Sequence, residues 1–97
     1  MISAKIHTHD NERILAACDE DILGMTFRDE RSKITVSERF YGGERISEEI
    51  FIERTKSVTI MNLVGNTVVD VAVKAGLVSE DCVMIIGGIK HAQTVVM

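Results

Sequence analysis

The segments ISAKIHT (residues 2–8) and RILAAC (residues 13–18) decide the fold. In the first, apolar and polar residues alternate and place Ile2, Ala4 and Ile6 on one face, which is the period of a half-buried β-strand. The second segment follows a polar turn at residues 10–12, and this spacing predicts its antiparallel partner. The chain therefore begins with a β-hairpin.

Shorter elements are expected next. Asp19 is placed to cap a single helical turn that Gly24 ends. Residues 25–27 and 34–36 form two alternating runs about the polar turn 29–32, which predicts a second hairpin. The sheet is therefore expected to be antiparallel up to this point.

The period changes after the glycine pair at residues 42–43. Ser47 is a suitable N-cap for a helix over residues 47–56, whose first turn is acidic and whose last turn is basic. An apolar stripe predicts another helix over residues 66–75, with Gly76 just past its end. Its valines are poor helix formers, so packing must stabilise it.

Three later segments complete the expected fold. Residues 58–64 are β-branched and fit either a strand or an early start of the next helix. Residues 82–86 are continuously apolar, the pattern of a central strand buried on both faces, and residues 94–96 fit an edge strand or a frayed tail. We therefore expect a single α+β domain over residues 1–97, with antiparallel hairpins packed against two helices and a late buried strand.

Composition narrows the function classes. The 97 residues carry a net charge of −4 without a basic stripe, which argues against strong nucleic-acid binding but is compatible with a local basic face. Cys18 and Cys82 lack metal-ligand spacing and suit a reducing compartment. A signal peptide and an apolar run of membrane-spanning length are both lacking, so we expect a cytoplasmic protein with no membrane partner.

Two double-glycine segments are the candidate sites. The run Tyr41-Gly42-Gly43-Glu44 precedes the first helix, where free amides could hold a phosphate or carboxylate; the alternative is a turn that folds the helix over the sheet. The run at residues 87–93 leaves the predicted late strand. There a neutral histidine could act as an acid, a base or a hydrogen-bond donor, or the segment could simply pack over the sheet.

Metal sites are not expected. His7 and His9 share a strand face, but a third and a fourth ligand are not evident. The acidic run at residues 19–21 lacks the spacing of a calcium loop. The sequence therefore predicts neither a metal nor another cofactor.

The order of four motifs resembles a family of uncharacterised archaeal proteins of about this length, catalogued as a domain of unknown function. The motifs are ACDE with LG and F (residues 17–27), FYGGE (40–44), NLVG (62–65), and GG with HAQ (87–93). The resemblance covers nearly the whole chain and implies family membership without an activity. It also implies that ten residues form one site: Tyr41, Gly42, Gly43, Glu44, Asn62, Gly65, Gly87, Gly88, His91 and Gln93.

These observations favour a small binding module over an enzyme, because no nucleophile–base pair or metal set is complete. We expect the glycine loops and Asn62 to meet at one end of the sheet and to bind an anionic or RNA-like partner. By analogy with other small archaeal proteins, that partner could be ribosomal RNA or another part of the translation apparatus. Two alternatives stay open: a small enzyme that uses His91 and Glu44 as acid and base, and a protein–protein adaptor or homodimer.

Overall fold

The N-terminal hairpin forms as its alternation predicts. The computed structural model describes residues 1–96 and pairs β1 (Ile2–His9) with β2 (Glu12–Asp19) along their full lengths. Asp10 makes the turn with φ 53°, a left-handed conformation that Asp tolerates better than most residues. This hairpin supplies two inner strands of the main sheet.

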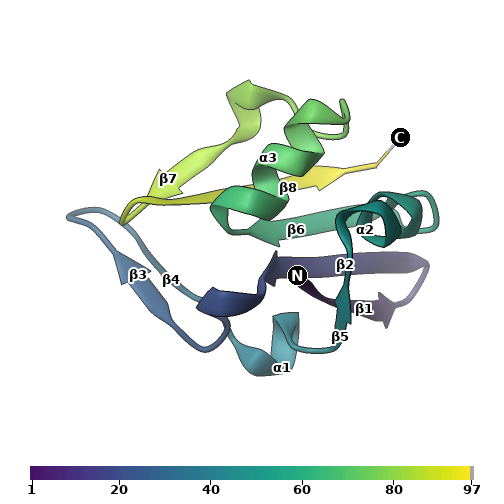
Figure 1. Ribbon diagram of the computed structural model, residues 1–97, viewed down its shortest axis with the longest axis horizontal. Helices are drawn as coiled ribbons and strands as arrows, with labels where there is room; N and C mark the ends of the chain where they lie inside the picture. Colours follow the sequence, from purple (N-terminus) through teal and green to yellow (C-terminus); the bar gives the residue numbers. More distant parts are fainter. Residues whose placement is uncertain (97) are drawn as a thin grey trace.

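Four later strands complete a six-stranded sheet in the order β5-β1-β2-β6-β8-β7 (Figure 1). They are β5 (Glu44–Ile46), β6 (Ile60–Val64), β7 (Met84–Ile86) and β8 (Ile89–Val95). β2 and β6 run parallel, whereas the other neighbouring pairs are antiparallel. The ambiguous segment 58–64 is therefore mostly a strand, and the predicted α+β class is confirmed.

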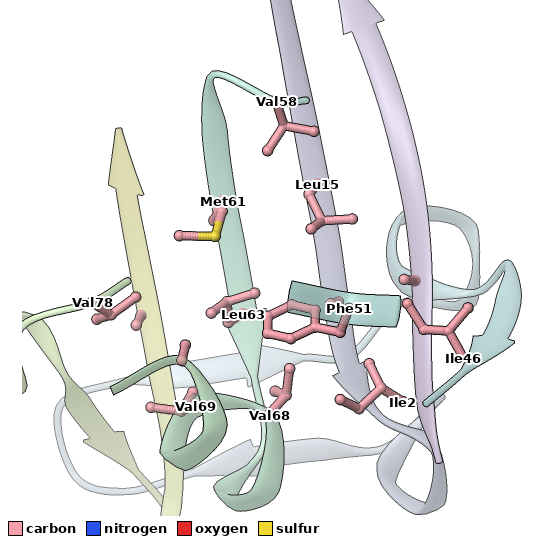
Figure 2. Packing of buried hydrophobic residues seen from close by; sticks show 14 residues of the cluster. Ile2, Leu15, Ile46, Phe51, Val58, Met61, Leu63, Val68, Val69 and Val78 are labelled. Carbon is pink, nitrogen blue, oxygen red and sulfur yellow. The ribbon is translucent and has the colours of Figure 1, made fainter. Parts of the chain in front are cut away.

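Two helices cover one face of this sheet, as predicted. α2 (Glu48–Thr55) is capped by Ser47, whose Oγ accepts from the Ile50 amide, and α3 (Asn66–Lys74) follows β6 directly. The ring of Phe51 fills the centre of the core between α2, α3 and the sheet (Figure 2). The buried residues of this core are Ile2, Ala4, Leu15, Ala17, Ile46, Phe51, Val58, Met61, Leu63, Val68, Val69, Ala72, Val78 and Ala92.

The opposite face of the sheet is covered only in part. The predicted second hairpin, β3 (Thr26–Arg28) with β4 (Lys33–Thr35), forms a separate two-stranded sheet on this side. The short helix α1 (Glu38–Tyr41) follows it. Together they enclose a second, smaller core of Ala16, Cys18, Ile22, Val36, Tyr41 and Val64. Neither α1 nor β5 was predicted.

The prediction of a central strand at residues 82–86 is wrong. β7 is the edge strand, and its Met84 and Ile85 side chains are 54% and 64% exposed. Residues Glu80–Cys82 form a single 3₁₀ turn instead. The late strand that lies inside the sheet is β8, which pairs with both β6 and β7, so residues 94 and 95 are neither an edge strand nor a frayed tail. A continuous apolar run indicates a strand, but it does not fix the position of that strand in the sheet.

Both cysteines are free thiols, Cys18 buried and Cys82 exposed. Among residues 1–96, no helix has the length and apolar character needed to cross a membrane.

Candidate functional site

The face of the sheet opposite α2 and α3, called the open face below, carries alternate residues of four neighbouring strands. Strand register aligns Lys5, Ala16, Asn62 and Gln93 in one row across this face. The next row consists of Ser3, Cys18, Val64 and His91. Because neighbouring strands lie about 4.8 Å apart, each row spans roughly 14 Å. Four of the predicted site residues, Tyr41, Asn62, His91 and Gln93, belong to this face or cover it.

Tyr41 links α1 to the middle row. Its side chain is 5% exposed, and its hydroxyl donates a 2.6 Å hydrogen bond to Asn62 Oδ1. Burial, with a smaller contribution from the neighbouring Cys18 thiol, raises the pKa of Tyr41 to about 12. The phenol therefore stays protonated at neutral pH and serves as a fixed hydrogen-bond donor to the amide of Asn62.

His91 is oriented by a backbone carbonyl. Its Nδ1 lies 3.0 Å from the carbonyl oxygen of Leu63. A carbonyl can only accept, so Nδ1 carries the proton in the neutral ring and Nε2 keeps its lone pair. The ring is partly exposed, and within residues 1–96 no hydrogen-bond partner of Nε2 is found. His91 therefore offers an acceptor to a partner on the open face.

Three polar residues of β1 fasten α1 over the open face. Ser3 Oγ, Lys5 Nζ and His7 Nε2 donate to backbone carbonyls of α1 at 2.9, 3.2 and 2.8 Å. The His7 ring also stacks on Phe40, with centroids 4.6 Å apart. Sequence reasoning missed these contacts, although the signal was present: Ser3, Lys5 and His7 are the polar half of the alternating pattern in β1.

The prediction that the two glycine pairs meet in one loop cluster is wrong. Gly43 leads into β5 and lies against the backbone of β1, whereas Gly87 and Gly88 form the turn between β7 and β8. β5 and β7 are the two edges of the sheet, so the pairs lie on opposite sides of the molecule. Gly42 and Gly43 instead serve local packing, because a Cβ at either position would collide with a backbone carbonyl, of Glu38 or Ala4 respectively.

Glu44 is also remote from His91. It lies on β5, where its carboxylate pairs with Arg54 of α2, and three strands separate β5 from β8. The two residues therefore do not form the acid–base pair that the enzymatic alternative requires. In the part of the chain that the structure describes, no group of three or more His, Cys, Asp and Glu side chains is arranged to hold a metal ion.

Gly65 has a structural role. Its φ of 126° lies in the region that favours glycine, and a Cβ there would fall 2.5 Å from the carboxyl carbon of Asp19. That carboxylate accepts from the amides of Thr67 and Val68, at 3.0 and 2.8 Å, and so caps α3. Asp19 was expected to cap the turn beside it, but its side chain makes no such bond.

Two comparisons with known proteins give a match. The family model described as "Protein of unknown function (DUF424)" matches residues 6–97. The chain belongs to this family. The resemblance stated from its motifs is thus confirmed. The chain is also similar to a crystal structure of an uncharacterised conserved protein from the archaeon Methanopyrus kandleri. The TM-score is 0.84, and the sequence identity is 28% over 99% of this chain and 91% of that one. The comparison with curated proteins gives no match.

The open face of this DUF424 protein brings several hydrogen-bonding side chains together. Asn62 and Gln93 face each other across β6 and β8, and His91 lies one row away. Lys5 lies in the same row as Asn62, and Arg39 projects from α1. The arrangement combines amide groups, an imidazole acceptor and two cations on one side of the sheet.

Proposed function

We propose that this protein is a binding module that presents its open face to an anionic, RNA-like partner. The observation that carries the proposal is the set of Asn62, His91 and Gln93, called the polar patch below. All three are at least partly exposed, although their neighbours in the same two rows, Ala16, Cys18 and Val64, are buried in the second core. Their outward polar groups are available to a ligand.

Charge supports an anionic partner. On the side of α2 and α3, Arg54 pairs with Glu44 and Lys90 with Asp70, whereas Lys74 forms no ion pair within residues 1–96. On the open face, Lys5 and Arg39 form no ion pair within residues 1–96. Although the chain is acidic overall, both cations are exposed and keep donors for phosphates, since Lys5 Nζ spends one donor on the Arg39 carbonyl.

The chemistry of the patch favours RNA over a simple anion. Side-chain amides and an imidazole hydrogen-bond to base edges, and single-stranded RNA exposes such edges. The stacked rings of His7 and Phe40 border the same face and add a flat aromatic surface. A ribosomal location would follow from such binding, and release of the protein from ribosomal fractions by salt or nuclease would test it.

The first prediction concerns charge. Replacing both Lys5 and Arg39 with Gln should weaken binding of a single-stranded RNA about ten-fold at low salt. The slope of log affinity against log salt should also become shallower by about 1 to 2, because binding releases fewer counterions when two phosphate contacts are lost. Fluorescence anisotropy of a labelled oligonucleotide measures both quantities.

The matched control replaces Lys56 and Lys74 with Gln, which removes the same charge from α2 and α3. This control should bind as the wild type does. Equal losses in the two double variants would show that binding follows net charge alone, and absence of binding to any RNA would reject the proposed function.

Self-association is a second candidate, favoured by the exposed apolar edge. β7 presents Ile85 to solvent beside a row of unpaired backbone groups, a surface that a second copy could extend. Asp29 accepts from the Gly87 amide at 3.2 Å and closes one end of this edge, so only a short stretch is free.

If β7 is the contact, the wild type should show a rising mass with concentration in light scattering, and Ile85→Lys should remain monomeric. Ile50→Lys is the control, because Ile50 is similarly exposed but lies on α2. A monomeric wild type at all concentrations would exclude this candidate.

A further inference from the structure

The orientation of the Asn62 amide is fixed. Because the Tyr41 hydroxyl donates to Oδ1, the amide group Nδ2 is turned away from Tyr41. Within the described residues, Nδ2 donates to no acceptor. Asn62 is partly exposed, so this group is a donor held in one orientation by a buried phenol.

An acceptor lies on the neighbouring strand, on the same face of the sheet. His91 Nε2 keeps its lone pair because Nδ1 donates to the Leu63 carbonyl. Asn62 lies opposite Gln93 and His91 lies opposite Val64, so Asn62 and His91 are diagonal neighbours on β6 and β8. Diagonal neighbours are about 7 to 8 Å apart at the backbone, and both side chains extend from the same face of the sheet, so one planar ligand can contact both.

We propose that Asn62 and His91 together bind the Watson–Crick edge of one unpaired nucleobase. Each of the four RNA bases carries a donor next to an acceptor on this edge, the complement of the Asn62 and His91 pair. A base pair occupies the same edge, so duplex RNA is excluded. The inference rests on the proposed function and adds that bases, and not phosphates alone, are recognised.

Tyr41 and Leu63 act here as positioning groups. The Tyr41 hydroxyl holds the amide of Asn62, and the Leu63 carbonyl holds the imidazole of His91. Both contacts come from rigid elements, a short helix and a sheet strand, so the donor and the acceptor are fixed before a ligand arrives. Gln93 lies beside them on β8, and its amide can contact the next group of the same base or its sugar.

The test compares three probes: a single-stranded RNA, an abasic oligonucleotide of the same length and phosphate count, and the same RNA annealed to its complement, which has the same length and twice the phosphates. Wild-type protein should bind the single strand about ten-fold more tightly than either of the others, within the range of one bidentate base contact. Asn62→Asp and His91→Ala should each bring the ratio of single-strand to abasic affinity close to one. The charge that Asn62→Asp introduces affects both probes alike and so drops out of this ratio. His91→Ala adds no charge.

Salt dependence separates this inference from the proposed function. Both variants should keep the wild-type salt slope, because they contact no phosphate. Equal, salt-sensitive affinity for the single strand and the abasic probe would overturn the base contact and leave the proposed function standing. Failure of all three probes to bind would overturn both. Circular dichroism confirms that each variant is folded.

Discussion

Gly65→Ala should lower the free energy of unfolding by about 2 to 4 kcal/mol. The substitution forces a side chain into a conformation with φ 126°, which costs about 1 to 3 kcal/mol. Its Cβ also displaces the Asp19 carboxylate that caps α3, and loss of a cap costs about 1 kcal/mol. Urea denaturation followed by circular dichroism measures the change.

Gly76→Ala is the matched control for this substitution. Gly76 also has a positive φ, 75°, but no atom lies within 4 Å of the position that its Cβ would take. Gly76→Ala should therefore lower the free energy of unfolding by only about 1 kcal/mol, the cost of the backbone conformation alone. Equal losses at the two positions would contradict the role assigned to Asp19, and loss of RNA binding by Gly65→Ala without loss of stability would return Gly65 to the binding site.

The phenol of Tyr41 should titrate near pH 12, and folding stability should fall as pH rises between about 10 and 12. The pKa of Tyr41 is raised from 10.0 to about 12 in the folded protein, so the unfolded chain loses this proton first. Deprotonation therefore favours unfolding in this window, by about 3 kcal/mol in total. The chain holds one tyrosine and no tryptophan, so ultraviolet difference absorbance reports Tyr41 alone.

Tyr41→Phe separates this effect from other alkaline changes. The variant should lose about 1 kcal/mol at neutral pH with the hydrogen bond to Asn62, yet decline less steeply above pH 10. Burial, followed by the charges of Asp19 and Asp21, also raises the pKa of Cys18 to about 12 from 9.0, so its thiol adds a loss that begins near pH 9. Cys18→Ala removes that part. A tyrosine midpoint near 10 would show that the phenol is exposed.

Local sequence patterns predicted which helices and strands form more accurately than they predicted which of these elements lie side by side. Alternation located the first hairpin, the capping residue Ser47 located α2, and an apolar stripe located α3. The predicted central position of residues 82–86 was wrong because inner strands and exposed edge strands can both be apolar. α1 was missed because four residues carry too little periodicity to stand out.

The candidate site was predicted in part. Asn62, His91 and Gln93 lie together because β6 and β8 pair, and this pairing of distant segments leaves no local signal. The glycines attracted attention because glycine frees backbone amides, but the same residue is needed wherever two backbones approach closely, as at Gly43 beside Ala4. Asp19 was assigned to the wrong helix because a cap forty-nine positions away from its partner Val68 cannot be read from spacing.

The parallel pair of β2 and β6 has a consequence for how the chain acquires its structure. It joins a strand from the first fifth of the sequence to one beyond the midpoint, and the Asp19 carboxylate ties the same early strand to the start of α3. Neither half can bury its apolar residues without the other, so the molecule has no autonomous subunit and folding waits for this long-range closure.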